Sequence, residues 1–217
     1  SWRCSSFMCG IAGIFEYRGE RPVDEALLRA ALRLIEHRGP DAEGVYRETF
    51  LGVGARRLSI IDVDGGNQPI FNETGRVAVV CNGEIYNYRE LSDQLRLRGH
   101  RFSSASDTEV IVHLYEELGE RCIDELRGMF ALAIWDADRR RLFLARDRLG
   151  IKPLYYVKGN GWLSFASEIK ALLVDQRIPR AVDLDGLSSF LSLKYVAAPG
   201  TMFESVEALP PGYTLTC

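Results

Sequence analysis

Residues 7–17 read FMCGIAGIFEY and place a cysteine, Cys9, directly before an alternating apolar run. The alternation predicts a buried β-strand over residues 9–17. Gly10 and Ala12 leave little bulk beside the thiol. Cys9 is therefore either a packed core cysteine or a nucleophile held at the end of a rigid strand, and the rest of the chain has to distinguish the two.

The composition bounds the class of protein. The chain has 217 residues, of which 47% are hydrophobic and 26% charged, as in a globular domain with a sizeable core. The net charge of -3 argues against a nucleic-acid-binding protein, which would be strongly basic. No apolar run approaches the roughly 20 residues of a membrane span, so neither nucleic acid nor membrane is an expected partner. Five scattered cysteines without a C-x-x-C pair indicate reduced thiols in the cytoplasm, and no metal site is predicted.

Apolar periodicity predicts both helices and strands. The expected helices cover residues 24–37, 88–97, 106–119, 167–173 and 183–193. The expected strands cover residues 51–55, 58–63, 77–81, 154–157 and 162–166, with a hairpin at 129–147 and a loop at 38–44. The expected strands are grouped along the sequence without a regular βαβ alternation, which favours an α+β fold with largely antiparallel sheets.

A cysteine nucleophile needs a base, and the three histidines are not arranged to provide one. His113 lies among apolar residues of a predicted helix, and no Ser-His-Asp pattern or H-E-x-x-H motif is present. If the chain matured after Met8, Cys9 would carry its own α-amine. Such an amine has a pKa of about 7.7–8.0, which suits a general base.

Asn82 and Gly83 follow the apolar run VVC and are expected where that strand breaks into a turn. An Asn-Gly pair is an ordinary turn signal, but an Asn amide and the next backbone N–H can also form an oxyanion hole. Glu84 follows in the same predicted turn, where it could bind a cation.

Two further segments carry charges that fit an amino-acid ligand. Arg56 and Arg57 are either a solvated pair or the source of a guanidinium that grips a carboxylate. Ser106 and Glu109 form the sequence pattern of a capping box, which leaves Asp107 as an unexplained carboxylate. An arginine and two acids would suit an α-carboxylate and an α-ammonium, although spacing alone does not bring them together.

Many of these segments occur in the same order as the motifs of a known protein family. MCGIAGIF, EHRGPDAEG, RRLSIID, CNGEIYNYREL, SDTEVI, LARDRLGIKPLYY and LPPG closely resemble the glutaminase half of glutamine-hydrolysing asparagine synthetases. These are class II glutamine amidotransferases of the N-terminal-nucleophile hydrolase fold. The resemblance spans residues 8–213 and implies a four-layer αββα sandwich with two mainly antiparallel sheets.

The resemblance also implies roles for individual residues. Cys9 would attack the carboxamide of L-glutamine, and Asn82 and Gly83 would hold the oxyanion. Glutamate and ammonia would form through a thioester, with the ammonia used for ATP-dependent synthesis of asparagine or a related amide. The implied substrate-binding residues are Arg57, Leu58, Ser59, Ile60, Ile61, Glu84 and Asp107.

The domain organisation follows from the same resemblance. Residues 1–8 are expected to be a leader or an addition from cloning, 9–190 the amidotransferase domain, and 191–217 the start of a connection to a C-terminal synthetase domain. No SGGxDS pyrophosphate-binding motif occurs. No cofactor is therefore expected here, with ATP and Mg²⁺ acting in the missing half, and a homodimer is possible. Two rival hypotheses are a catalytically silent glutamine-binding domain and an amidase with another substrate.

Overall fold

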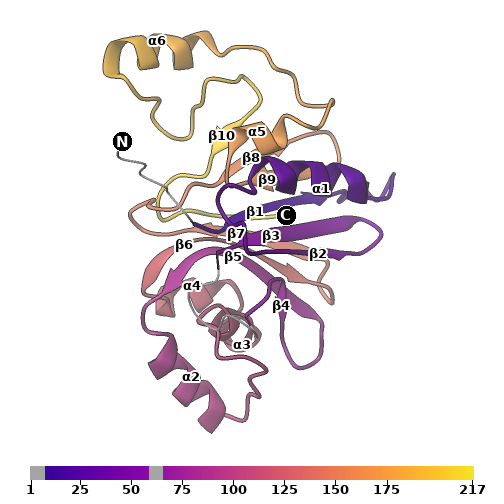
Figure 1. Cartoon of the computed structure of the whole chain (residues 1–217), viewed down its shortest axis with the longest axis vertical. Helices are drawn as coiled ribbons and strands as arrows, with labels where there is room; N and C mark the ends of the chain where they lie inside the picture. The colour runs from indigo at the N-terminus through magenta and orange to yellow at the C-terminus, as the bar shows by residue number, and fades with distance from the viewer. Residues whose placement is uncertain (1–7, 59–65) are drawn as a thin grey trace.

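The computed structural model describes residues 8–58 and 66–217, which form two stacked antiparallel sheets (Figure 1). The first sheet has the order β10 (Glu207–Ala208), β8 (Tyr155–Lys158), β9 (Leu163–Ala166), β1 (Gly10–Phe15), β3 (Leu51–Arg57) and β2 (Ala42–Arg47). The second has the order β11 (Thr214–Thr216), β7 (Arg141–Arg146), β6 (Gly128–Asp136), β5 (Val77–Ile85) and β4 (Ile70–Phe71). Every strand pair of both sheets is antiparallel.

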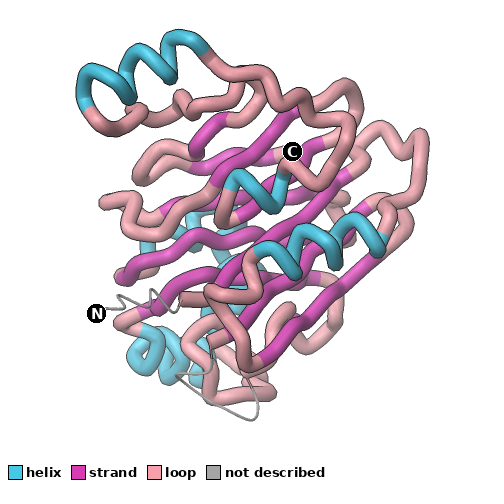
Figure 2. The backbone as a smooth tube through the Cα atoms, turned by 45° about the horizontal axis from the view of Figure 1, so that its top comes forward, coloured by secondary structure: helices cyan, strands magenta, loops and turns pink. Residues whose placement is uncertain are grey.

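Helices cover the outer face of each sheet (Figure 2). The first sheet is covered by α1 (Glu25–Leu34) and α5 (Ile169–Leu172), which share one apolar cluster with β1 and β9. The second is covered by α2 (Tyr88–Leu97), α3 (Glu109–Leu118) and α4 (Cys122–Glu125). A third cluster fills the space between the sheets. The predicted four-layer αββα sandwich is therefore confirmed.

Side-chain alternation along β5 shows how one strand serves two layers. Ala78 and Val80 point to the core between the sheets, whereas Val79 and Cys81 point to the helices. Successive strand side chains face opposite sides, so an almost continuous apolar run is buried on both faces. This explains why the central strands look apolar rather than amphipathic in the sequence.

Most of the predicted elements are present at nearly the predicted positions. Helix α2 and the β6–β7 hairpin match their predictions closely, and α1, α3, α5, α6 (Leu184–Leu193), β8 and β9 match within a few residues. The predicted loop at 38–44 is wrong in part, because β2 begins at Ala42 and pairs along β3. The predicted strand at 58–63 lies outside the described residues, except for Leu58, which is not in a strand.

The last part of the chain contributes to both sheets. From the segment 191–217, β10 adds an edge strand beside β8 and β11 adds one beside β7. Helix α6 stands apart from the two sheets at the top of Figure 1. Among the helices of the described residues, none combines the length and the apolarity needed to cross a membrane.

Candidate active site

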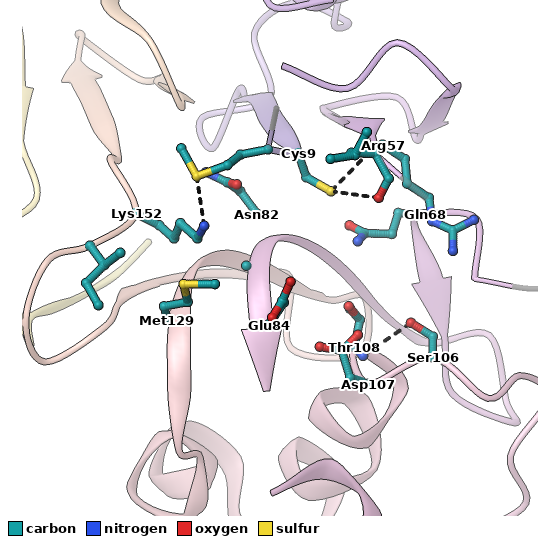
Figure 3. Close-up of a pocket in the computed structure, with 14 residues that line it drawn as sticks. Cys9, Arg57, Gln68, Asn82, Glu84, Ser106, Asp107, Thr108, Met129 and Lys152 are labelled. Carbon is teal, nitrogen blue, oxygen red and sulfur yellow. Dashed lines mark hydrogen bonds between the residues drawn. The ribbon is translucent and has the colours of Figure 1, made fainter. Parts of the chain in front are cut away.

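A pocket of about 340 Å³ opens where the start of β1 lies close to the ends of β3 and β5 (Figure 3). Its walls come from both sheets, from the start of α3 and from the loop before β8. The lining residues are Met8, Cys9, Arg57, Leu58, Gln68, Asn82, Gly83, Glu84, Ser106, Asp107, Thr108, Met129, Ile151 and Lys152.

Cys9 is held at this pocket by the backbone on either side of it. The following residues form β1 between β3 and β9, and the carbonyl of Cys9 accepts a hydrogen bond of 3.1 Å from Arg38 Nε. Arg38 is buried and paired with Glu168 at 3.0 Å. The thiol accepts from the backbone N–H of Leu58 at 3.4 Å. A half-buried cysteine on a rigid strand end is therefore exposed to the pocket, not packed in the core.

The electrostatic environment favours the neutral thiol. Burial raises the pKa of Cys9 above its usual value, while the hydrogen bond from Leu58 and the charge of Arg57 act in the opposite direction. Within the described residues that line the pocket, none is a histidine. Deprotonation of Cys9 therefore needs a base other than a histidine of this pocket.

Asn82 and Gly83 lie inside β5 and not in the predicted turn. The strand continues to Ile85, with Asn82 opposite Ala131 and Gly83 opposite Phe130 on β6. A Cβ on Gly83 would come within 2.1 Å of the Met129 carbonyl oxygen, so the close pairing of the two strands requires glycine. The turn prediction is wrong because cross-strand pairing outweighs the local preference of Asn-Gly.

The side-chain amide of Asn82 is buried without a partner. The residue is fully inaccessible, and neither its Oδ1 nor its Nδ2 has a hydrogen-bond partner among the described residues. An unsatisfied buried amide costs about 1–3 kcal/mol, which marks it as a group kept for a ligand. Because Asn82 lines the pocket with Cys9, its amide can donate to a substrate oxygen.

Arg56 and Arg57 both belong to β3 and both are buried, so the solvated-pair interpretation is wrong. They differ in direction. Arg56 turns away and pairs with Glu43 at 2.7 Å. Arg57 lines the pocket and donates to Asn67 Oδ1 at 3.2 Å.

Two carboxylates lie across the pocket from Cys9 (Figure 3). Asp107 accepts a hydrogen bond of 2.8 Å from the backbone N–H of Ile85, which fixes its orientation. Burial raises the pKa of Asp107, and the nearby Glu84 carboxylate raises it further. The hydrogen bond from Ile85 acts in the opposite direction. A positively charged group bound between Glu84 and Asp107 would relieve this repulsion.

The predicted capping box between Ser106 and Glu109 does not form, because each residue has other hydrogen-bond partners. Glu109 accepts hydrogen bonds from Ser103 and Ser104, through both their backbone N–H groups and their hydroxyls. Ser106 instead lines the pocket, and its hydroxyl accepts from the N–H of Thr108 at 3.3 Å.

The structure brings most of the predicted site residues together and adds others. Cys9, Arg57, Leu58, Asn82, Gly83, Glu84 and Asp107 all line this pocket, whereas Ser59, Ile60 and Ile61 lie outside the described residues. Gln68 and Lys152 also line the pocket, although neither is among the predicted site residues. Gln68 makes paired bonds with the backbone of Cys81 at 2.6 and 3.1 Å, and Lys152 Nζ lies 2.9 Å from Met8 Sδ.

A family model described as a glutamine amidotransferase domain matches residues 8–217. Asparagine synthetase [glutamine-hydrolyzing] 3 of Bacillus subtilis is 39% identical over 96% of this chain and 34% of its own length. Asparagine synthetase [glutamine-hydrolyzing] 2 of Oryza sativa is 42% identical over 77% of this chain and 28% of its own length. The chain thus spans about a third of the curated relatives that it matches.

Solved structures share the fold at lower identity. The glutamine phosphoribosylpyrophosphate amidotransferase of B. subtilis matches 76% of this chain and 43% of its own, with a TM-score of 0.63 at 21% identity. A structure described as the allosteric regulatory enzyme of purine biosynthesis matches 96% of this chain and 46% of its own, with a TM-score of 0.68 at 19% identity. Both support the αββα architecture.

Proposed function

Since the chain belongs to the glutamine amidotransferase domain family, we propose that it hydrolyses L-glutamine to glutamate and ammonia through a thioester on Cys9. The observation that carries the proposal is the convergence of different groups on one pocket. A thiol, a buried amide without a partner, an arginine and two carboxylates line the same 340 Å³. These groups match the reacting carboxamide and the charged α-substituents of glutamine.

In the proposed first step, once residues 1–8 have been removed, the α-amine of Cys9 removes the thiol proton and the thiolate attacks the carboxamide carbon. The carbonyl oxygen becomes an oxyanion that accepts hydrogen bonds from the Asn82 amide and the Gly83 N–H. The amine then returns the proton to the departing nitrogen, so that ammonia leaves and a glutamyl thioester remains. Water, deprotonated by the same amine, breaks the thioester and releases glutamate.

The remaining pocket groups would orient the amino-acid end of glutamine. We assign the α-carboxylate to the guanidinium of Arg57 and to the adjacent segment 58–61, and the α-ammonium to Glu84 and Asp107. The Glu84 carboxylate raises the pKa of Asp107, as expected when two acids repel each other. A bound ammonium offsets that repulsion, so substrate binding makes their proximity favourable.

The fate of the ammonia is inferred from the relatives, which are named as asparagine synthetases. We propose that it serves ATP-dependent synthesis of asparagine or a related amide, in a C-terminal synthetase domain that follows residues 191–217 of the full-length protein. ATP and Mg²⁺ would act in that domain, and we assign no residue of the described chain to them. A cytoplasmic location and a homodimer are consistent with this proposal.

Arg57→Ala is expected to weaken glutamine binding. Loss of a charge-assisted hydrogen bond costs about 1.5–3 kcal/mol, which raises KM roughly 10- to 150-fold. Steady-state assays of glutamate release measure the effect. Arg56→Ala is the matched control, because Arg56 is also a buried arginine of β3 but pairs with Glu43 outside the pocket. An unchanged KM in Arg57→Ala would refute the carboxylate assignment.

Asn82→Ala is expected to lower kcat by about 10²–10³ with little change in KM, because an oxyanion donor acts mainly in the transition state. Asn82→Asp keeps the shape of the side chain but removes the N–H donor, so it should lose at least as much activity. Stopped assays over a range of glutamine concentrations separate the two parameters. A rise in KM at constant kcat would assign Asn82 to ground-state binding instead.

A further inference from the structure

A second group of ionisable side chains lies outside the pocket, at the end of the molecule that carries α2, α3 and β4 (Figure 1). We call it the His–Glu cluster. Its members are Glu73, His100, His113 and Glu116. Glu73 lies in the turn between β4 and β5, His100 follows α2, and the other two are on α3. None of the four lines the active-site pocket.

The four side chains direct their polar atoms at one point. His113 Nδ1 is 3.3 Å from Glu116 Oε2 and 3.4 Å from Glu73 Oε2. His100 Nδ1 is 3.5 Å from Glu73 Oε1 and 3.6 Å from Glu116 Oε2. One nitrogen or oxygen from each residue lies within 4.8 Å of all the others. Each imidazole therefore faces both carboxylates through the same ring nitrogen.

These spacings fit a tetrahedral metal ion. Zinc binds imidazole nitrogen and carboxylate oxygen at about 2.0–2.2 Å, which sets the edges of the ligand tetrahedron at about 3.3–3.6 Å. The nitrogen–oxygen distances of the cluster are of that size, with Oε2 of Glu116 facing both imidazoles and a different oxygen of Glu73 facing each of them. Two imidazoles among the ligands favour zinc or a similar transition metal over calcium or magnesium. We propose that the His–Glu cluster binds one divalent transition metal ion, with zinc as the best match.

The surroundings of the histidines support the assignment. His100 Nε2, on the far side of its ring, is 3.2 Å from Glu117 Oε1. His113 is wholly buried, and its Nε2 is 3.7 Å from Glu109 Oε1 without any closer partner among the described residues. Protein metal sites commonly orient a histidine ligand as His100 is held here, through a carboxylate that accepts from the other ring nitrogen, whereas 3.7 Å is too long for such a bond from His113.

The carboxylates of the cluster are oriented as well. Glu73 Oε1 accepts from the backbone N–H of Arg101 at 2.7 Å, and Glu116 Oε1 accepts from Asn72 Nδ2 at 2.7 Å. Each carboxylate thus has one oxygen held by the protein and the other facing His113 Nδ1. This arrangement fixes the ligands before the ion binds.

Charge balance also favours a cation. Four carboxylates surround the two histidines, namely those of Glu73, Glu109, Glu116 and Glu117, and Arg98 forms an ion pair with Glu117. Neutral imidazoles leave three acids without a positive partner in these contacts. A dication placed between the histidines compensates most of that negative charge.

A metal ion here would join three separate parts of the chain. It would connect the β4–β5 turn, the end of α2 and the middle of α3. The loop between His100 and α3 carries Asp107 and Thr108 to the active-site pocket. The ion would therefore act as a structural clamp at the base of a loop that lines the pocket.

Metal binding to the purified full chain tests this proposal. After removal of metal with a chelator, Zn²⁺ titrated against a chromophoric chelator is expected to show one site per chain. His100→Gln is expected to weaken that site at least 100-fold, and Glu117→Gln about 10-fold. His37→Gln is the matched control, because His37 is an exposed histidine that contacts Glu168 elsewhere, and it should retain the affinity of the unmodified chain.

The absorption spectrum of the Co²⁺-bound chain identifies the type of ligand. It distinguishes binding at the His–Glu cluster from binding to cysteine thiolates. The expected spectrum has tetrahedral d–d bands without thiolate charge transfer. Thermal unfolding should show that Zn²⁺ raises the Tm of the unmodified chain but not that of His100→Gln, whose metal-free fold is checked by circular dichroism. If that variant does not fold, Glu116→Gln replaces it. Absence of binding, thiolate bands, or equal affinity in the ligand variants would overturn the proposal.

Discussion

Replacing Cys9 with alanine, in a chain that begins at Cys9, is expected to lower glutamate release at least about 10⁴-fold, as loss of a catalytic nucleophile does elsewhere. The reason is chemical, because no other side chain of the described pocket is a thiol or is placed to form the thioester. Steady-state release of glutamate and of ammonia measures the loss.

The matched control is Cys122→Ala. Cys122 is another cysteine, but it is buried in the helical layer that covers the second sheet and lies away from the pocket. Its replacement should leave kcat within a few-fold of the unmodified chain. If Cys9→Ala retained most of the activity while glutamine still bound, a catalytically silent role for Cys9 would be favoured and the thioester mechanism would be wrong.

The second large effect concerns the α-amine of Cys9. A chain that retains residues 1–8 is expected to have no measurable glutaminase activity, and a chain that begins at Cys9 is expected to regain it. An amide nitrogen is not basic, so the attached residues remove the base of the proposed mechanism, and general-base catalysis contributes about 10²–10⁴-fold. The pKa of Cys9 is raised by burial, which makes the missing base more important.

Met8 adds a steric reason to this prediction. It lines the pocket beside Cys9, its backbone N–H donates to the Arg38 carbonyl at 2.9 Å, and its sulfur contacts Lys152. The carboxamide of glutamine would have to share this space. Activity assays of both purified chains are paired with intact-mass spectra before and after, because cleavage after Met8 during the assay would restore the amine. Full activity with the leader intact would contradict the amine mechanism.

The layered fold could be predicted from the sequence where apolar periodicity was strong. The β6–β7 hairpin and α2 are examples, since two apolar runs on either side of a polar turn define the first and one apolar helix face defines the second. Strand β2 was missed because AEGVYR has few apolar residues and is specified by its pairing with β3. The short strands β10 and β11 depend on partner strands distant in sequence, and the two-residue β4 depends on its pairing with the adjacent β5.

The site could be predicted only where a residue belonged to a recognisable segment. Asn82 and Gly83 were identified, but their place inside β5 was not, because nine consecutive pairings with β6 override a turn preference. Lys152 belongs to the recognisable segment LARDRLGIKPLYY, but neither it nor Gln68 is part of a local pattern that places the side chain at the pocket. The His–Glu cluster was missed for the same reason, since its members come from three segments and match no metal-binding spacing.

The central claim, that the Cys9 thiol attacks the carboxamide carbon of glutamine, is tested most directly by trapping the attack. A glutamine analogue with a diazomethyl ketone in place of the carboxamide would alkylate the nucleophile with loss of dinitrogen. Peptide mass mapping of the chain that begins at Cys9 is expected to locate a single adduct on Cys9, with inactivation in proportion and protection by excess glutamine. An adduct on another residue, or inactivation that leaves Cys9 unmodified, would contradict the account.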